Sequence, residues 1–262
     1  MVRPKKFLGQ HFLNDENIAR KIIDYIPAGY TNVIEVGAGT GVLSKYLLAN
    51  EKLNPLFFEV DYESIKYLKV HYPEMQGNLI ETDFLRYDLS QVPSPFIICG
   101  NFPYNISTQI LFKVLTCRNQ VPFVLGMFQK EVAERIASPP GSKKYGILSV
   151  LMKAWYDVEY LFTVNESVFI PPPKVKSAVI CLRRNDIDQI GCNEELFFKV
   201  VKTAFNQRRK VLRNALKVLI SAENSLPVST DPERLESLLA NRAEQLSVED
   251  FVFLTNWISD FY

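Results

Sequence analysis

The tetrapeptide Asn101-Phe102-Pro103-Tyr104 brings together an amide, a carbonyl beside a rigid proline, and an aromatic ring. The Asn101 side-chain oxygen can accept one N–H and the carbonyl of Phe102 or Pro103 another, which suits the amine of a nucleobase. Tyr104 supplies a ring on which the base can stack. The same residues also fit a plain turn that ends a strand. The place of the tetrapeptide in the fold decides between these two interpretations.

The tetrapeptide follows the apolar run 96–100, which is short and β-branched and therefore indicates a buried strand. In open α/β sheets, ligands bind beyond the carboxyl ends of the strands. Two other predicted strands also end on acids. Glu59 is placed to accept hydrogen bonds from ribose hydroxyls, and Asp83 can accept an adenine N6 hydrogen, with Phe84 packing on the ring. Each acid alone would also fit a helix cap or a solvated strand end.

A glycine-rich turn, Gly37-Ala38-Gly39-Thr40-Gly41, follows the first predicted strand. Gly37 and Gly39 allow a tight turn and a close approach of the backbone to a ligand. The spacing is G-x-G-x-G rather than the G-x-G-x-x-G that holds a pyrophosphate, and no Lys or Arg accompanies it. A nucleoside without phosphates fits these residues. They favour S-adenosylmethionine as the cofactor over NAD or ATP.

Apolar runs alternate with helical patterns up to about residue 183, which predicts a doubly wound α/β sheet. No helix separates the last two strands, so we expect an antiparallel edge hairpin and a seven-stranded, Rossmann-like class I methyltransferase architecture. We expect a methyltransferase domain at 1–185 and a small all-helical domain at 186–262. The predicted strands are 32–36, 55–60, 78–82, 96–100, 123–128, 159–164 and 178–182; the predicted helices are 17–25, 42–48, 62–71, 108–115, 130–136, 147–155, 194–205, 208–220, 231–239 and 248–259.

The composition of the 262 residues, 47% hydrophobic and 23% charged, is that of a globular protein able to bury a core. The sequence has no apolar run near the ~20 residues that span a bilayer and no signal-peptide pattern, so we expect a cytoplasmic protein without membrane contact. Four cysteines without a C-x-x-C pair and only two histidines argue against a metal site.

Positive charge is concentrated between Leu196 and Ala222, where seven basic residues occur without an acid. Without them, 23 of the 30 basic residues remain against 29 acidic ones, so a basic surface belongs to an otherwise acidic protein. Such a surface is typical of phosphate binding, although a solvated helix face would look similar. We call residues 199–217 the basic segment. The residues predicted to bind RNA are Arg208, Arg209, Lys210, Arg213 and Lys217, of which Arg209, Arg213 and Lys217 share one face of the helix expected at 208–220.

Taken together, these motifs resemble the ribosomal RNA adenine N6-dimethyltransferases, and within them the bacterial small-subunit group named for kasugamycin sensitivity. The resemblance runs through nearly the whole chain. It departs at Ala38, often Pro in the family, and at Phe102, usually Leu or Ile. The matching pieces are 9–13 (GQHFL), the glycine turn, Glu59, Asp83, 101–107 (NFPYNIS), 129–133 (QKEVA), 171–175 (PPPKV) and 204–210 (AFNQRRK).

The resemblance implies a role for individual residues. The carbonyl of Pro103, with Asn101 and Tyr104, would hold the target adenine. Phe169 would stack on its other face, unless it is a hydrophobic plug beneath the hairpin. The residues implied to contact S-adenosylmethionine are His11, Leu13, Gly37, Glu59, Asp83 and Asn101, to which the reasoning from the residues above adds Gly39 and Phe84.

The implied activity is dimethylation of N6 on two adjacent adenosines in a hairpin loop near the 3′ end of 16S rRNA, within the small ribosomal subunit and linked to its biogenesis. One alternative is a 23S rRNA adenine methyltransferase of the macrolide-resistance type, against which residues 207–210 and the long helical C-terminus argue. A DNA adenine methyltransferase is disfavoured, because nothing resembles a sequence-reading domain. A mainly non-catalytic assembly checkpoint factor is a further alternative. The sequence leaves the oligomeric state open and favours a monomer.

Overall fold

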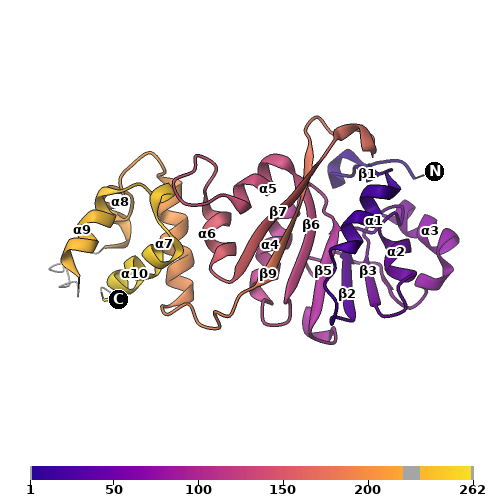
Figure 1. The fold of residues 1–262 in the computed structure, drawn as a ribbon, viewed down its shortest axis with the longest axis horizontal. Helices are drawn as coiled ribbons and strands as arrows, with labels where there is room; N and C mark the ends of the chain where they lie inside the picture. The colour runs from indigo at the N-terminus through magenta and orange to yellow at the C-terminus, as the bar shows by residue number, and fades with distance from the viewer. Residues whose placement is uncertain (1, 221–230, 261–262) are drawn as a thin grey trace. The chain divides into compact units, whose positions relative to one another are not determined.

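The main sheet has seven strands, most of them parallel (Figure 1). The structure is a computed structural model that describes residues 2–220 and 231–260. The strand order of the sheet is β4-β3-β2-β5-β6-β9-β7, and β9 runs antiparallel to β6. The neighbours from β4 to β6 pair in parallel. This confirms the predicted fold class. The strands are β2 Asn32–Val36, β3 Asn54–Phe58, β4 Leu79–Ile80, β5 Phe96–Asn101, β6 Phe123–Gln129, β7 Tyr156–Val164 and β9 Ser177–Arg184.

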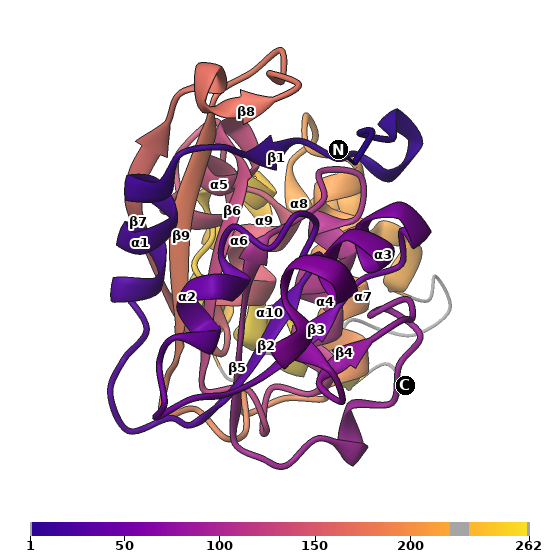
Figure 2. The same ribbon diagram turned by 90° about the vertical axis from the view of Figure 1, so that its right-hand side faces the viewer.

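The strands are nearly continuous hydrophobic runs because both faces of the sheet are buried. Val33, Ile97 and Leu125 belong to one core cluster, which also takes in Ala19 of α1 and Leu47 of α2. Residues of opposite parity point to the other face, and Figure 2 shows the two helices α1 and α2 on the same side of the sheet. The helices of this part are α1 Glu16–Asp24, α2 Ser44–Leu48, α3 Tyr62–His71, α4 Ser107–Thr116 and α5 Lys130–Ala137.

A small antiparallel pair that the sequence did not reveal joins β1, Phe12–Leu13, to β8, Phe169–Ile170. Two residues are too few for the alternation that identifies a strand. The pair fixes the N-terminal segment to the loop between β7 and β9, and thereby brings residues 9–12 to the carboxyl end of the sheet.

The chain divides into two compact units, formed by residues 1–133 and 158–184 and by residues 134–157 and 185–262. The segment 134–157 therefore groups with the C-terminal helices, whereas we expected a single domain over 1–185. It does so because its apolar residues pack on those helices; Trp155, for example, contacts Phe197. The functional division into a methyltransferase domain at 1–185 and a helical domain at 186–262 stays a prediction. The helices of the second unit include α6 Ile147–Lys153, α7 Glu194–Asn206, α8 Leu212–Ala215, α9 Pro232–Ala240 and α10 Val248–Ser259.

The continuous helix predicted at 208–220 is wrong. Helix α7 ends at Asn206, and Val211 is extended, with φ −67° and ψ 152°, before the single turn of α8 and a 3-10 turn at Lys217–Leu219. The backbone of Val211 bridges to Arg242, and the Leu212 N–H donates to the carbonyl of Asn241 at 2.8 Å. This tertiary pairing outweighs the helical pattern. Among the described residues, no helix is long and apolar enough to cross a membrane.

Candidate active site

A cavity of about 250 Å³ lies at the carboxyl ends of β2, β3, β4 and β5. It is the place where the sheet topology predicts a ligand. The structure brings most of the predicted site residues together here. Those that line the cavity are His11, Gly37, Gly39, Glu59, Asp83, Phe84, Asn101, Pro103 and Tyr104.

The glycine turn is fastened to the end of β3 by Glu59. Gly37 and Gly39 have φ of +78° and +56°, a region that favours glycine. The Gly39 N–H donates to Glu59 Oε2 at 2.8 Å, while the N–H groups of Val60 and Asp61 donate to Oε1, each at 2.8 Å. Oε1 accepts two hydrogen bonds and Oε2 only one. Oε2 can therefore accept a further hydrogen bond from a ligand hydroxyl. Burial raises the pKa of Glu59 in spite of these three donors.

The wall beyond β4 is formed by Asp83 and Phe84. Asp83 Oδ1 accepts the Leu85 N–H at 2.9 Å, and Asp83 Oδ2 lies 3.6 Å from the exposed Arg86. Oδ2 therefore remains able to accept a hydrogen from an amine. Phe84 is buried, and its ring meets Phe58 edge-on with the centroids 5.4 Å apart. Both rings of this pair line the cavity.

Asn101 is oriented by the N-terminal segment. Its Nδ2 donates to the backbone carbonyl of His11 at 2.8 Å, which leaves Oδ1 as an acceptor. His11 is held in turn, because its Nδ1 is 2.8 Å from the carbonyl oxygen of Pro171 and must carry a proton to donate to it. The backbone of His11 therefore fixes which end of the Asn101 amide faces the cavity.

Pro103 and Tyr104 continue the wall past Asn101. The Pro103 carbonyl accepts the Ile106 N–H at 3.1 Å, which uses one of its two lone pairs. The Tyr104 hydroxyl is hydrogen-bonded to that of Ser177, and burial raises its pKa, so the phenol stays neutral at physiological pH. The Tyr104 ring lies 5.2 Å from the His11 ring, tilted by 31°. A half-buried aromatic face thus adjoins the free Asn101 oxygen.

Two of the predicted site residues, Leu13 and Phe169, do not line the cavity. They pair with each other in the β1–β8 ladder and are 3% and 1% exposed, within the core cluster. The Phe169 ring therefore lies in the core in this structure, and its stacking on a base stays a prediction. Stacking would require this ring to leave the core. Any cofactor contact of Leu13 would have to come from its backbone.

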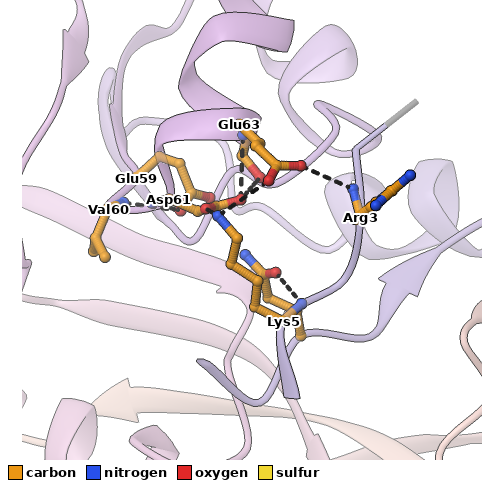
Figure 3. A network of polar contacts seen from close by, with 8 residues as sticks. Arg3, Lys5, Glu59, Val60, Asp61 and Glu63 are labelled. Atoms are coloured by element: carbon orange, nitrogen blue, oxygen red, sulfur yellow. Dashed lines mark hydrogen bonds and ion pairs between the residues drawn. The ribbon is translucent and has the colours of Figure 1, made fainter. Parts of the chain in front are cut away.

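Ion pairs and a hydrogen bond attach the N-terminal segment to residues 61–63, which follow β3, as Figure 3 shows. The Lys5 ammonium pairs with Asp61 and lies 3.6 Å from Glu63, whose carboxylate also accepts the Arg3 N–H at 3.4 Å. Burial alone would raise the pKa of Asp61, but Lys5 and Ser64 outweigh it and lower that pKa. These contacts help to explain how residues 8–12 of the N-terminal segment come to line the cavity.

Sequence reasoning missed several lining residues. Gln109 lies in the first turn of α4, three residues after Ile106, so both reach the cavity from beside the tetrapeptide. Val60 follows Glu59 directly and is 50% exposed, a signal available only from the structure. None of the described lining residues is Lys or Arg, which agrees with a ligand that carries no phosphate. The lining residues not predicted are Leu8, Gly9, Gln10, Phe12, Val36, Phe58, Val60, Thr82, Leu85, Phe102, Asn105, Ile106 and Gln109.

The basic segment belongs to the helical unit and is not uniformly free. Arg208 donates through Nε to Glu244 at 2.5 Å and also to the carbonyl of Lys143, and Arg213 pairs with Glu236. In contrast, Arg209, Lys210 and Lys217 are exposed and have no ion pair with any described acid. The five residues predicted to bind RNA therefore divide into two engaged arginines and three free cations. Within the part of the chain that is described, no cluster of His, Cys, Asp or Glu could hold a metal.

The strand order, the antiparallel edge and the cavity at the carboxyl ends define the class: the fold is that of a class I methyltransferase. The chain belongs to the ribosomal RNA adenine dimethylase family, whose model matches residues 1–260. The expected family and enzyme class are confirmed.

The relatives agree along the full length of the chain. It is 52% identical to the ribosomal RNA small subunit methyltransferase A of Bacteroides thetaiotaomicron over 99% of this chain and 96% of the relative. It is 54% identical to that of Flavobacterium johnsoniae over 98% and 96%. A dimethyladenosine transferase from Plasmodium falciparum matches with a TM-score of 0.76 and 26% identity, over 96% of this chain and 100% of that one. The 23S rRNA methyltransferase ErmE, at 22% identity and a TM-score of 0.69, shares the fold.

Proposed function

We propose that this protein transfers methyl groups from S-adenosylmethionine to N6 of two adjacent adenosines in a hairpin loop near the 3′ end of 16S rRNA, within the small ribosomal subunit. Membership of the family and the names of the relatives support the rRNA of the small subunit over the 23S alternative. One observation carries the site assignment. The Asn101 amide nitrogen is committed to His11, so its oxygen is left facing the cavity.

The cavity suits the proposed cofactor. Glu59 Oε2 would accept a ribose hydroxyl, Asp83 Oδ2 would accept the adenine amine, and Phe84 offers an apolar surface to the ring. The backbone of the glycine turn can come close to a ligand without a Cβ in the way. When bound, S-adenosylmethionine supplies an electrophilic methyl group on a positively charged sulfur. The protein's task is then mainly to position the acceptor.

The target amine is a poor nucleophile because its lone pair is delocalised into the adenine ring. Asn101 Oδ1 would accept one of its N–H groups and the Pro103 carbonyl the other. Two acceptors on the same nitrogen favour a more tetrahedral geometry, which turns the lone pair toward the methyl group. Tyr104 would stack on the base and offset about 1–3 kcal/mol of the cost of taking it out of the RNA stack.

Dimethylation follows from the same contacts used twice. After the first transfer the nitrogen keeps one hydrogen, which either acceptor can hold. Each transfer first gives a positively charged nitrogen, which is strongly acidic, so it loses a proton to solvent without a dedicated base and becomes neutral again. The buried, neutral phenol of Tyr104 fits a stacking role rather than that of a base.

The basic segment supports the choice of an RNA substrate. We assign phosphate contacts to Arg209, Lys210 and Lys217, because exposed cations without acid partners are available to a polyanion. Arg208 and Arg213 are already paired with Glu244 and Glu236, so their charge is partly compensated before any RNA binds. Positive charge on the helical unit thus complements a cavity that contains no Lys or Arg among its described lining residues.

A transfer assay with labelled S-adenosylmethionine tests the proposed function. The substrates are small subunits lacking the modification, mature small subunits, large subunits and duplex DNA, and the product is mapped to the nucleotide. We expect two methyl groups on each of two adjacent adenosines of the unmodified small subunit. Preferential labelling of large subunits would support the macrolide-resistance alternative, and binding to small subunits without transfer would support the checkpoint alternative.

A further inference from the structure

Lys113 has an unusual set of partners for a lysine that is partly buried. Its Nζ donates to the carbonyl of Leu85 at 2.9 Å and to that of Tyr87 at 2.6 Å. The same nitrogen lies 5.2 Å from the centre of the Phe84 ring. No ion pair joins Lys113 to an acid anywhere in the described chain. The Lys113 ammonium is thus stabilised by hydrogen bonds to two carbonyls and by an aromatic ring, in place of an ion pair with a carboxylate.

The position of Lys113 connects the two halves of the candidate site. Helix α4 begins at Ser107, immediately after the segment that contains Asn101 and Tyr104, and the Ser107 hydroxyl donates to the Tyr104 carbonyl at 3.3 Å. Gln109, one turn before Lys113, lines the cavity. From the same helix, Lys113 reaches the loop after β4. Helix α4 therefore adjoins the segment with Asn101 and Tyr104 at its start. Near its end, through Lys113, it contacts the loop that carries Asp83 and Phe84.

Besides the contacts from Lys113, the loop after β4 has hydrogen bonds within its own turn and apolar packing. Asp83 closes a turn by accepting the Leu85 N–H, and its carbonyl accepts the N–H groups of Arg86 and Tyr87 at 3.0 and 3.2 Å. These hydrogen bonds shape the turn internally but do not fix its position. Packing of Phe84 and Tyr87 on Phe58 gives apolar contact without direction. Lys113 supplies the directed polar contacts that set where the wall stands.

We propose that Lys113 is a positioning residue, which holds the Asp83–Phe84 wall at the distance from Glu59 that binds the nucleoside part of the cofactor. This inference rests on the proposed function. Replacing the ammonium by an apolar group leaves two carbonyls without their donor and removes the charge above the Phe84 ring. The wall can then move relative to Glu59. The affinity for the nucleoside falls, while Asn101 and Tyr104 stay in place.

A matched control exists in the helical unit. Lys153 also donates to two backbone carbonyls, those of Ala137 at 3.1 Å and Ser138 at 2.8 Å. Burial lowers the pKa of both lysines. Lys153→Met therefore removes the same kind of anchor at a place that does not line the cavity. A general loss of stability should be similar in the two variants, whereas a loss of cofactor affinity should be specific to Lys113→Met.

The experiment measures the dissociation constant of S-adenosylhomocysteine by calorimetry, together with the KM for the cofactor and kcat on small subunits. For Lys113→Met we expect the dissociation constant and the KM to rise about tenfold, with kcat at saturating cofactor within about twofold of wild type. Lys113→Arg, which can donate to both carbonyls, should recover most of the affinity. Lys153→Met should bind as the wild type does.

Hydrogen exchange provides a second readout, which also serves if Lys113→Met folds poorly. In Lys113→Gln, which keeps an amide donor but is shorter and uncharged, the amides of residues 84–88 should exchange faster than in wild type, while those of β5 do not change. Unchanged affinity and exchange in folded Lys113 variants, or an equal loss in Lys153→Met, would overturn the positioning role. If the wild type does not bind S-adenosylhomocysteine, the proposed function itself fails, and this role with it.

Discussion

The cavity and the basic segment use polar side chains in opposite ways. In the cavity, Glu59 and Asn101 are each held by backbone groups from distant parts of the chain, at 2.8 Å, so that one chosen oxygen faces the ligand. In the basic segment, Arg209, Lys210 and Lys217 point into solvent without acid partners in the described chain. The first region depends on atomic position and the second on the amount of charge. Substitutions in the cavity should therefore change the rate of methyl transfer, whereas substitutions in the basic segment should change the affinity for RNA and its salt dependence.

The largest effect is expected from Asn101→Ala. Loss of the acceptor that orients the target amine should lower methyl transfer by about 100-fold or more, since small losses of positioning have effects of this size. Binding to small subunits should stay within about twofold of wild type. A radiolabel transfer assay and a filter-binding assay measure the two quantities.

Asn32→Ala is the matched control for that substitution, because the Asn32 amide also donates to backbone carbonyls, those of Pro93 and Pro95, but lies outside the cavity. Its transfer activity should be near that of the wild type. If Asn101→Ala methylates at the wild-type rate, the assignment of the target-base site is wrong.

The next effect concerns charge. Replacing Arg209, Lys210 and Lys217 together by Gln should weaken binding to small subunits about tenfold near 150 mM salt. The slope of log affinity against log salt concentration should become shallower by roughly 2 to 3. Fewer phosphate contacts are made by the variant, so fewer counterions are released when it binds. Binding titrations over a range of salt concentrations measure both. An unchanged slope would mean that these three cations are merely solvated.

A smaller effect distinguishes the engaged arginines. Arg208→Met removes the ion pair with Glu244 and the hydrogen bond to the Lys143 carbonyl, so we expect a loss of about 1 kcal/mol in the free energy of unfolding. The salt slope should change little. Denaturant unfolding and the same salt titration test this. A loss of slope like that of the triple variant would show that Arg208 leaves Glu244 to bind RNA.

The parallel sheet and the helical unit should also respond to pH with opposite sign. Burial raises the pKa of Glu35 to about 8, against the hydrogen bond from Ser44, and nearby Glu59 adds to the shift. The folded protein then binds a proton that the unfolded chain has lost above its ordinary pKa of 4.5. Stability therefore falls as pH rises toward 8 and levels off beyond it. Glu35→Gln should flatten this dependence, as measured by melting temperature from pH 5 to 9.

Asp250 in the helical unit provides the contrast. Burial alone would raise its pKa, but Arg234 and Ser247 outweigh burial and lower it below 3.8. Its contribution to stability is therefore present at neutral pH and lost as pH falls through that lowered value. Asp250→Asn should destabilise the protein at pH 7 and reduce its further loss of stability in acid. If Asp250→Asn loses stability in acid just as the wild type does, while Glu35→Gln has a flat profile, the pH response belongs to Glu35 in the sheet and Asp250 has no part in it.

Much of the fold was predictable because each strand of the parallel sheet is an apolar run bounded by turn residues. The strands β2 and β5 and the helices α3 and α10 lie where the patterns put them, within a residue or two. The helix at 208–220 failed because Val211 pairs with Arg242, a partner distant in sequence. The β1–β8 ladder was missed because strands of two residues have no periodicity to detect.

The sequence by itself determined the chemistry: which strand ends carry an acid or an amide, where glycine permits a close approach, and that positive charge is concentrated near residue 208. These are local properties of residue type and spacing. Only the tertiary structure decided which groups are available. It showed that the nitrogen of Asn101 is used by His11, that the ring of Phe169 is in the core, and that Lys113 donates to the carbonyls of Leu85 and Tyr87. Availability depends on partners distant in sequence, which no local pattern specifies.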